Sequence, residues 1–395
     1  MYINHMGSNI LNFKSNKHGI FKYHYILLFV IVFLILFLIY FLLFFKTNNK
    51  LINPTSSNIS TELSQIEYVQ NPLTGVFYDK KNVQWHGQRP ISVMINNHID
   101  ARPQSGLENA DVVYEMIAEG GITRFLAFYL SDLPNKIGPV RSTREYYLVL
   151  VKELADSMIM HIGYSPQALQ AIQDWPVRSL ARGGAEFYRD QERLKTVATE
   201  HTAYVDGPYL RKLGDSLGWG GVGDISVYKF KEDTPKSNKL TNGDNLESLS
   251  QSGELKYSDQ ISIDFWYPGD YTAIFKYNQN KNSYLRFMGY DQNNNPLPHI
   301  DNETKNQLEV KNLIVQYVAE SPIQGDEKNR LTYDLVGSGK AVVFIDGIAI
   351  DSTWIKSSRD ERTKFYDLKG NEIEFNKGKF WIGIVPDRNV SQVVY

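Results

Sequence analysis

The feature that most constrains this chain is an uninterrupted apolar run near its N-terminus. Residues 25–45 read YILLFVIVFLILFLIYFLLFF, 21 residues without a charged residue, glycine or proline. As an α-helix rising about 1.5 Å per residue, this run spans roughly 31 Å, close to the hydrocarbon thickness of a bilayer. Buried helices of globular proteins are rarely so long or apolar on every face. The run therefore predicts a single transmembrane helix over residues 25–45.

The charges that flank this run indicate its orientation. Residues 1–24 contain three lysines and no acidic residue, whereas only Lys46 and Lys50 follow the run closely. Since positive residues favour the cytoplasmic side of a membrane, residues 1–24 are predicted to form a cytoplasmic tail. No small-x-small cleavage site follows the run, so a signal anchor explains it better than a cleaved signal peptide. We therefore expect a single-pass protein of the cell membrane whose C-terminal domains are extracytoplasmic.

The composition of the chain excludes several classes of function. Its 395 residues include 42 Lys and Arg against 44 Asp and Glu, a formal net charge of −2. Nucleic-acid affinity rests on clustered excess cations, so no nucleic-acid partner is expected. The chain has no cysteine, which excludes disulfides, thiolate nucleophiles, cysteine-ligated zinc and a lipid anchor on a cysteine. No cofactor is predicted, and a phosphate or glycan site would require a local group of arginines.

The chain changes in character after the apolar run. Residues 46–70 are rich in Asn, Ser and Thr and are predicted to form a flexible tether. In residues 71–230, short apolar strands alternate with amphipathic helices, which is typical of a layered α/β domain. The strands are expected over residues 91–96, 112–117, 123–130 and 158–162, and the helices over residues 142–157, 165–173 and 208–217.

The last third of the chain has a different pattern. Residues 231–256 are polar and poor in large apolar residues, so we expect a linker there. Residues 257–395 contain short strand-like stretches separated by turn residues, such as Asp346-Gly347. This spacing predicts a β-rich C-terminal domain, barrel- or sandwich-like. The predicted fold is an α/β N-terminal domain followed by this mainly β domain, on a single N-terminal transmembrane helix.

Two sequence motifs suggest chemistry but lack the required context. Residues 218–223 match G-x-G-x-x-G, yet a predicted helix precedes them and a strand follows, the reverse of a dinucleotide site. Ser165 lies where a strand runs into a helix, as in a nucleophile elbow, but the second glycine of that motif is missing. Ser followed by Pro at a helix start is also the pattern of an N-cap, which we favour.

Polar side chains gather after the predicted strand ends, where ligands bind in open α/β sheets. Arg141 and Arg144 lie near the predicted start of a helix, whose amide groups and dipole favour anions. The sequence therefore suggests an anion pocket. The alternative, which the sequence leaves open, is that the same charges form ordinary structural ion pairs. The candidate ligand-binding residues are His98, Asp100, Arg102, Glu115, Glu119, Arg124, Arg141, Arg144, His161 and Arg182.

The same residues include possible metal ligands. His98, Asp100 and His161 could supply ligands, but no helical H-x3-H pattern or tight carboxylate cluster supports them. The sequence therefore predicts no metal site, and catalytic residues stay unknown.

Three stretches of sequence resemble a known family. NNHIDARPQSGLENADVVYEMIAEGGITRFLAFY, KIGPVRSTREYY and HIGYSPQA, with GSGKAVVFIDGIAIDSTWIKSS near the C-terminus, are similar to the YerB-like family of bacterial envelope proteins. The resemblance covers most of the chain from about Asn71 onward. It implies paired N- and C-terminal domains of unknown function, often on lipoproteins, and it transfers no catalytic residue. This chain departs from the family because the lipobox cysteine is absent and the apolar run takes its place.

Two functions follow as hypotheses. The first is a binding or accessory module of the bacterial envelope, with a cell-wall glycan, a phosphate-bearing polymer or an envelope protein as its partner besides the membrane. The alternative is a phosphotransferase-like enzyme that acts on polyprenyl-linked wall polymers. That alternative rests on an architectural similarity of Asp111, Arg124, Arg141 and Arg144 to LytR–CpsA–Psr enzymes, which orient a lipid pyrophosphate with arginines.

Overall fold

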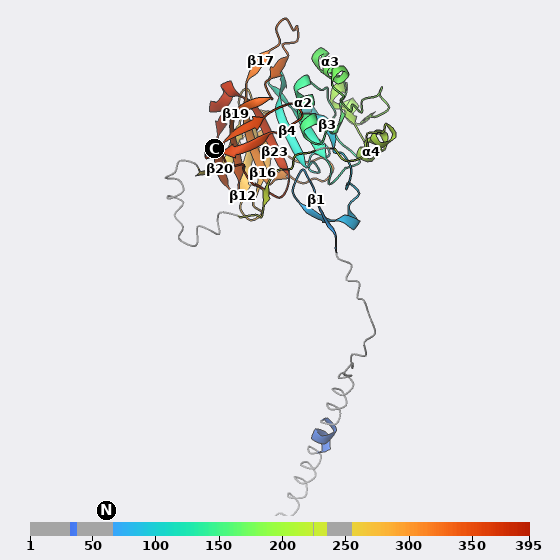
Figure 1. Cartoon of the computed structure of the whole chain (residues 1–395), viewed down its shortest axis with the longest axis vertical. Coiled ribbons are helices and arrows are strands. Elements are labelled where there is room, and N and C mark those ends of the chain that lie inside the picture. The colour runs from blue at the N-terminus through green and yellow to red at the C-terminus, as the bar shows by residue number, and fades with distance from the viewer. Residues whose placement is uncertain (1–31, 38–65, 224, 235–254) are drawn as a thin grey trace, which may run out of the picture. The chain divides into compact units, whose positions relative to one another are not determined.

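The structure is a computed structural model that describes residues 32–37, 66–223, 225–234 and 255–395 (Figure 1). The chain divides into two units, residues 1–65 and 66–395, and the fold described below belongs to the second. The predicted tail lies outside the described residues, as does most of the predicted membrane span and tether. Residues 32–37 of the span are helical. Within the described ranges, no helix has both the length and the apolar character needed to cross a bilayer.

A ten-stranded sheet forms the centre of residues 66–395. Its strands come from both predicted segments of the chain. They are β3 (Ile91–Asn96), β4 (Val112–Glu119), β5 (Ile122–Tyr129), β6 (Met158–Met160), β10 (Leu255–Tyr257), β16 (Asn312–Val318), β19 (Gly337–Ile345), β20 (Ile348–Lys356), β21 (Lys364–Asp367) and β23 (Phe380–Pro386). The order is β10-β20-β19-β16-β23-β4-β5-β3-β6, with β21 alongside β20. β23 pairs in parallel with both β16 and β4 and so joins the two segments.

Six strands of this sheet run in the same direction, the sixth being β20, which is antiparallel to β19 as β19 is to β16. β6 is parallel to β3, β23 is parallel to β4, and β16 is parallel to β23, while β5 is antiparallel to both β3 and β4. The C-terminal ends of β3, β4, β6, β16 and β23 therefore lie along one edge of the sheet. This is the edge at which the sequence predicts polar side chains.

A second sheet of six strands contributes to the β-rich half. Its strands are β11 (Gln260–Ile263), β12 (Ala273–Asn278), β13 (Ser283–Tyr290), β14 (Pro296–Pro298), β15 (Glu309–Val310) and β24 (Val393–Val394). The order is β14-β13-β12-β11-β24, and β15 pairs with β13. The second half of the chain thus supplies strands to two sheets and does not close a β domain by itself.

Residue alternation along the central strands produces two hydrophobic faces. Val93 on β3 and Val113 on β4 pack in one cluster with Phe275 of the six-stranded sheet. Their neighbours Met94 and Tyr114 point to the opposite face and pack with side chains of the helices α2 (Glu145–Glu153) and α3 (Pro166–Asp174). The two segments predicted as separate domains are therefore described as one packed unit with shared cores.

The remaining elements are short and lie mainly in connections. They are α4 (Gly207–Ser216), the strands β1 (Tyr68–Gln70), β2 (Phe77–Asp79), β7 (Tyr188–Arg189), β8 (Ala203–Tyr204), β9 (Phe230–Lys231), β17 (Glu320–Pro322), β18 (Leu331–Tyr333) and β22 (Phe375–Asn376), and the 3₁₀ helices η1 (Lys80–Asn82), η2 (Ile99–Ala101), η3 (Arg193–Lys195), η4 (Thr199–His201) and η5 (Asp387–Gln392). β9 pairs in parallel with β22, which is a further link between the two halves of the chain.

The helices and strands predicted between residues 91 and 217 agree with the structure except at their ends, whereas the strand predicted after residue 223 is reduced to β9. The strand predicted over residues 91–96 is confirmed, and Asp346 and Gly347 form the turn between β19 and β20 with positive φ angles of 55° and 77°. The helix predicted over residues 142–157 is shorter. It begins at Glu145 because Arg144 occupies the N-cap position, without a side-chain capping bond.

Candidate functional site

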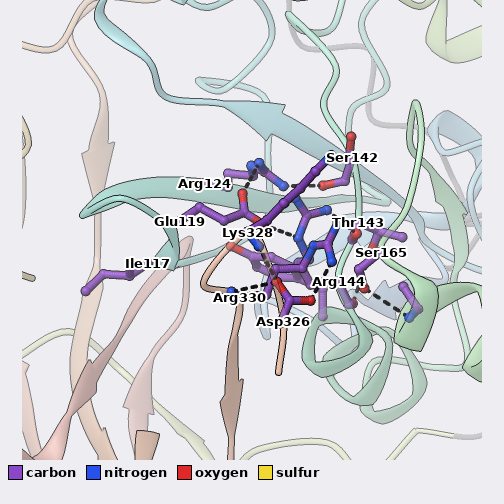
Figure 2. Close-up of polar contacts among 12 residues, drawn as sticks. Ile117, Glu119, Arg124, Ser142, Thr143, Arg144, Ser165, Asp326, Lys328 and Arg330 are labelled. Carbon is purple, nitrogen blue, oxygen red and sulfur yellow. Dashed lines mark hydrogen bonds and ion pairs between the residues drawn. The ribbon is translucent and has the colours of Figure 1, made fainter. Parts of the chain in front are cut away.

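Two groups of polar side chains occupy the strand-end edge of the central sheet. One, named here the arginine cluster, consists of Glu119, Arg124, Arg144, Asp326 and Arg330 (Figure 2). The other, named the histidine cluster, consists of His98, Asp100, Arg141, Glu200 and His201. The structure thus distributes the ten predicted residues between these clusters and several separate environments.

The arginine cluster centres on Glu119, at the end of β4. Arg124 contacts one carboxylate oxygen of Glu119 at 2.7 Å, and Arg144 bonds to the other. Both guanidinium groups also donate to backbone carbonyls, Arg124 to Ser142 at 2.8 Å and Arg144 to Thr143 at 2.7 Å. Burial alone would raise the pKa of Glu119, but the charges of Arg124 and Arg144 outweigh it and lower that pKa. These two arginines are therefore paired internally.

The loop between β17 and β18 lies against this cluster. Asp326 and Arg330 of the loop form an ion pair at 2.6 Å, and Figure 2 shows Lys328 lying across the same group. Arg330 contributes to the lowered pKa of Glu119, after burial, Arg124 and Arg144. The loop therefore adds to a network of structural ion pairs that holds the strand-end edge together. For Arg124, Arg144 and Glu119, the structure supports the ion-pair alternative over a ligand pocket.

Glu115 lies in the core and not in a pocket. It is fully buried in an ion pair with Arg286 at 2.7 Å, and it also accepts from Trp381 at 3.0 Å and Thr123 at 2.9 Å. The guanidinium of Arg286 stacks over the Trp381 ring, 4.2 Å from its centroid. Because Arg286 and Trp381 belong to the C-terminal half, this network joins the two halves at their shared core.

Three other residues that were predicted to bind a ligand make contacts within the protein. His161 is buried between the carbonyl of Gly163 and the hydroxyl of Ser179, each 2.9 Å away, and burial lowers its pKa to about 4. Arg102 bonds to Asn97 and lies over the Tyr271 ring, while burial lowers its pKa to about 10. Arg182 lies over the Trp219 ring, 5.9 Å from its centroid. His161 therefore has no part in a site with His98 and Asp100.

The histidine cluster is built from three segments that meet beside the end of β3. His98 and Asp100 lie at the start of η2, directly after β3. The segment that ends at Arg141 runs between β3 and β8, since the N–H of Arg141 donates to Met94 at 2.9 Å and that of Val140 to Ala203 at 2.7 Å. The third segment is η4, just before β8, and it carries Glu200 and His201. Backbone pairing therefore brings residues about 100 positions apart to one place.

His201 takes the place that the sequence analysis considered for His161. The rings of His98 and His201 stack with centroids 4.6 Å apart and planes 15° apart. One nitrogen of each ring and one oxygen of Asp100 lie within 4.8 Å of one another. Sequence reasoning missed His201 because no local spacing relates it to His98. The signal that could have found it is the neighbouring strand β8, which was not predicted.

Hydrogen bonds fix which nitrogen of each ring carries the proton. The side-chain oxygen of Asn96 accepts from the N–H of His98 at 3.0 Å, so the NH2 group of Asn96 faces Nδ1 of His201, 2.8 Å away, and donates to it. The N–H of Asp100 donates to Nδ1 of His98 at 3.2 Å. Since both Nδ1 atoms accept, each neutral ring carries its proton on Nε2.

This protonation pattern bears on the kind of ligand that the cluster fits. A metal ion binds an imidazole nitrogen through its lone pair, whereas Nε2–H is a hydrogen-bond donor. Because the Nδ1 atoms of His98 and His201 already accept hydrogen bonds, the Nε2–H group of each ring acts as a hydrogen-bond donor. The two rings therefore fit an anion better than a metal ion.

Arg141 supplies the positive charge of this cluster. Within the described part of the chain, its guanidinium makes no hydrogen bond or ion pair, unlike those of Arg124 and Arg144. It lies near enough to His201 to affect its pKa, which is lowered first by burial and then by His98, with Arg141 adding to the effect. The pKa of Glu200 is lowered first by its own backbone N–H and further by Arg141. Arg141 and Arg144 thus face different surroundings.

Comparison with known proteins places this structure in a family. Residues 73–219 match "Protein of unknown function (DUF3048) N-terminal domain", and residues 261–382 match "Protein of unknown function (DUF3048) C-terminal domain". The chain is 30% identical over 326 residues to "Putative lipoprotein YerB" of Bacillus subtilis (strain 168), covering 82% of this chain and 88% of that protein. The crystal structure of the YerB protein from Bacillus subtilis matches with a TM-score of 0.66 and 28% identity, covering 82% of this chain and 99% of that chain. The resemblance inferred from sequence is confirmed, and the chain belongs to the YerB-like family with its paired DUF3048 domains.

Proposed function

We propose that this protein is an envelope protein held in the cell membrane by residues 25–45, with residues 66–395 outside the cytoplasm. We further propose that it binds an anionic group of the phosphate class at the histidine cluster. The lipoprotein description of the YerB relative supports attachment to a membrane. Because this chain has no cysteine to carry a lipid, the 21-residue apolar run is the segment that can supply the anchor.

The observation that carries the binding proposal is the environment of Arg141. Within the described residues, the guanidinium of Arg141 makes no hydrogen bond or ion pair, and it lies in the same cluster as two stacked imidazoles whose Nε2–H groups are donors. Arginine is suited to phosphate because its fork of donors matches two oxygens at once. Asn96 holds both histidines in place, so the donors are arranged before a ligand arrives.

Thermal unfolding of the full chain in detergent tests this binding. Phosphate or sulfate should raise the melting temperature, since a ligand that binds only the folded state stabilises it by RT ln(1 + [L]/Kd). Arg141→Ala should fold with nearly the parent melting temperature and should lose this anion effect. Arg182→Ala is the matched control, because Arg182 lies over Trp219 and not in the cluster, and it should keep the effect. An Arg141→Ala variant that responds to phosphate like the parent, with chloride at equal ionic strength as reference, would disprove the site.

The topology has a test of its own. Protease added to intact protoplasts should remove the large C-terminal fragment, because residues 66–395 are proposed to face outward. Full protection of that fragment, with degradation only after the cells are lysed, would show the opposite orientation.

The phosphotransferase alternative gains no support from the geometry. Asp111, its proposed acidic residue, is buried and accepts from the N–H groups of Leu130 at 2.6 Å and Ser131 at 2.9 Å, and also from the Ser131 hydroxyl. Arg124 and Arg144 are bonded to Glu119. Of the residues considered for that chemistry, Arg141 alone has a guanidinium or carboxylate without such partners in the described ranges.

A further inference from the structure

We infer that the ligand of the histidine cluster is a phosphodiester whose alcohol parts carry free hydroxyl groups, as in a polyol or sugar phosphodiester. This inference rests on the proposed function and names the class of ligand for the same site. It is drawn from the two carboxylates of the cluster, Asp100 and Glu200, which the anion proposal leaves without a role.

The carboxylates of Asp100 and Glu200 have lone pairs that no side-chain donor of the described residues occupies. Asp100 is half exposed, and its side-chain contact in the described structure is with Nδ1 of His98 at 3.5 Å. That nitrogen already accepts from the N–H of Asp100, so a neutral ring has no proton to give to the carboxylate. Glu200 is exposed, and its carboxylate accepts from its own backbone N–H, which leaves further lone pairs of that carboxylate open. Both carboxylates are thus free to accept hydrogen bonds from a ligand.

The charges of the cluster make a phosphate dianion a weaker ligand than a phosphate group with a single negative charge. An oxygen of Asp100 lies within 4.8 Å of a nitrogen of each imidazole, so the cluster contains a negative carboxylate beside both rings. Like charges repel, and this repulsion increases with the charge of the anion. A phosphodiester carries one negative charge instead of two. Hydroxyl groups on its alcohol part could donate to Asp100 and Glu200 and turn the acidic neighbours into ligand contacts.

Hydrogen bonds from neighbouring side chains fix the positions of the donors and acceptors of the histidine cluster. Gln104 donates to the carbonyl of Asn96 at 3.1 Å, and its oxygen contacts buried His299 at 2.8 Å. Arg193 donates to the carbonyls of Asp100 and His201 and so connects η2 with η4. These hydrogen bonds connect the histidine cluster to the shared core of the protein, and this rigid support favours a defined ligand geometry.

Isothermal titration of the full chain in detergent tests the inference with two soluble phosphodiesters. Glycerophosphoglycerol carries free hydroxyls, and dimethyl phosphate carries none. Glycerophosphoglycerol should bind about tenfold more tightly, equivalent to about 1.4 kcal/mol. In the double variant Asp100→Ala and Glu200→Ala this preference should disappear, while dimethyl phosphate should bind as well as before or better. Arg141→Ala should abolish the binding of both diesters.

The outcomes separate the inference from the proposed function. Equal affinities for the two diesters in the parent protein would overturn the hydroxyl inference and leave anion binding in place. Binding of neither diester, together with no thermal effect of phosphate, would overturn both. A preference for glycerophosphoglycerol that survives in the double variant would also overturn the inference, because the hydroxyl groups would then be recognised elsewhere.

The same chemistry could come from a soluble wall polymer or from a lipid headgroup, and a competition experiment distinguishes these sources. The full chain is placed in nanodiscs of phosphatidylcholine, with or without phosphatidylglycerol, and titrated with glycerophosphoglycerol. Weaker binding in the phosphatidylglycerol discs supports a headgroup as the occupant of the cluster. Equal binding in both discs supports a polymer, and either result requires that the diester binds through Arg141.

Discussion

At the scale of single residues, the arginine cluster shows how one carboxylate compensates the charges of two arginines. Glu119 balances Arg124 and Arg144, whose guanidinium groups are largely buried. Glu119→Gln should lower the free energy of unfolding by about 1–3 kcal/mol, because the charges that remain are partly desolvated. Urea denaturation at pH 7 measures this loss. Glu192→Gln is the control, since Glu192 pairs with Lys195 at the exposed surface and should change stability by less than about 1 kcal/mol.

The effect of Glu119 should depend on pH with a definite sign. Its pKa is lowered in the folded protein, so its contribution is fully present above the unfolded pKa and disappears as the pH falls through the lower folded value. The stability difference between the parent and Glu119→Gln should hold from about pH 7 to about pH 5 and shrink below about pH 4.3, the ordinary pKa of glutamate. A difference that grows on acidification would contradict the pairing.

The buried pair of Glu115 and Arg286 should respond more strongly. Both side chains are fully buried, so Arg286→Met leaves a carboxylate without its cation and should cost about 3–5 kcal/mol. The double variant Glu115→Gln and Arg286→Met removes both charges and should recover part of this loss. A double-mutant cycle by urea denaturation measures the coupling. Additive losses would show that the two side chains do not interact.

These residues also show why the site could be predicted only in part. The sequence predicts His98 and Asp100 after a strand end, where the structure has them, because strand ends can be read from local patterns. It predicts Arg141 near the start of a helix, whereas the backbone of Arg141 pairs with β3. It did not reveal that Glu115 pairs with Arg286, 171 positions away, or that His201 stacks on His98. Such partners depend on strand order and loop packing. Local spacing carries no information about either of them.

At the scale of elements, the start of α3 shows a local signal that the structure confirms. The hydroxyl of Ser165 accepts from the N–H of Ala168 at 3.1 Å, and Pro166 occupies the first turn. Ser165→Ala should therefore lower the free energy of unfolding by about 1 kcal/mol. Ser165→Asp should retain most of the stability, since aspartate also caps helices. If alanine and aspartate were equally destabilising, the role of Ser165 would not be that of a cap.

The start of α2 shows where such signals fail. Ser142 and Thr143 are good capping residues, yet the helix begins at Glu145 with Arg144 in the N-cap position. The reason is tertiary, because Arg144 is held by Glu119 and by the carbonyl of Thr143. Propensity predicts the presence of this helix, whereas its first residue is set by an ion pair with another strand.

At the scale of the whole molecule, β23 explains why two sequence segments behave as one structure. It lies near the C-terminus but pairs in parallel with β4 of the first segment, from Phe380 opposite Val112 to Ile384 opposite Met116. The polar composition of residues 231–256 predicts a boundary in the sequence, and the family also divides there into two domains. Composition cannot show that the later segment returns to complete the sheet of the earlier one.

This topology makes a prediction about cleavage between the two segments. A specific protease site inserted within residues 235–254 allows the full chain to be cut in detergent after folding. The two fragments should still elute together in gel filtration, because β23 lies between β16 and β4 and the buried pair of Glu115 and Arg286 crosses the cut. They should separate only in denaturant. In the Arg286→Met variant the cut fragments should dissociate at a lower urea concentration, since one of the buried links is lost. Fragments that elute separately without denaturant would instead show that the two segments are independent domains.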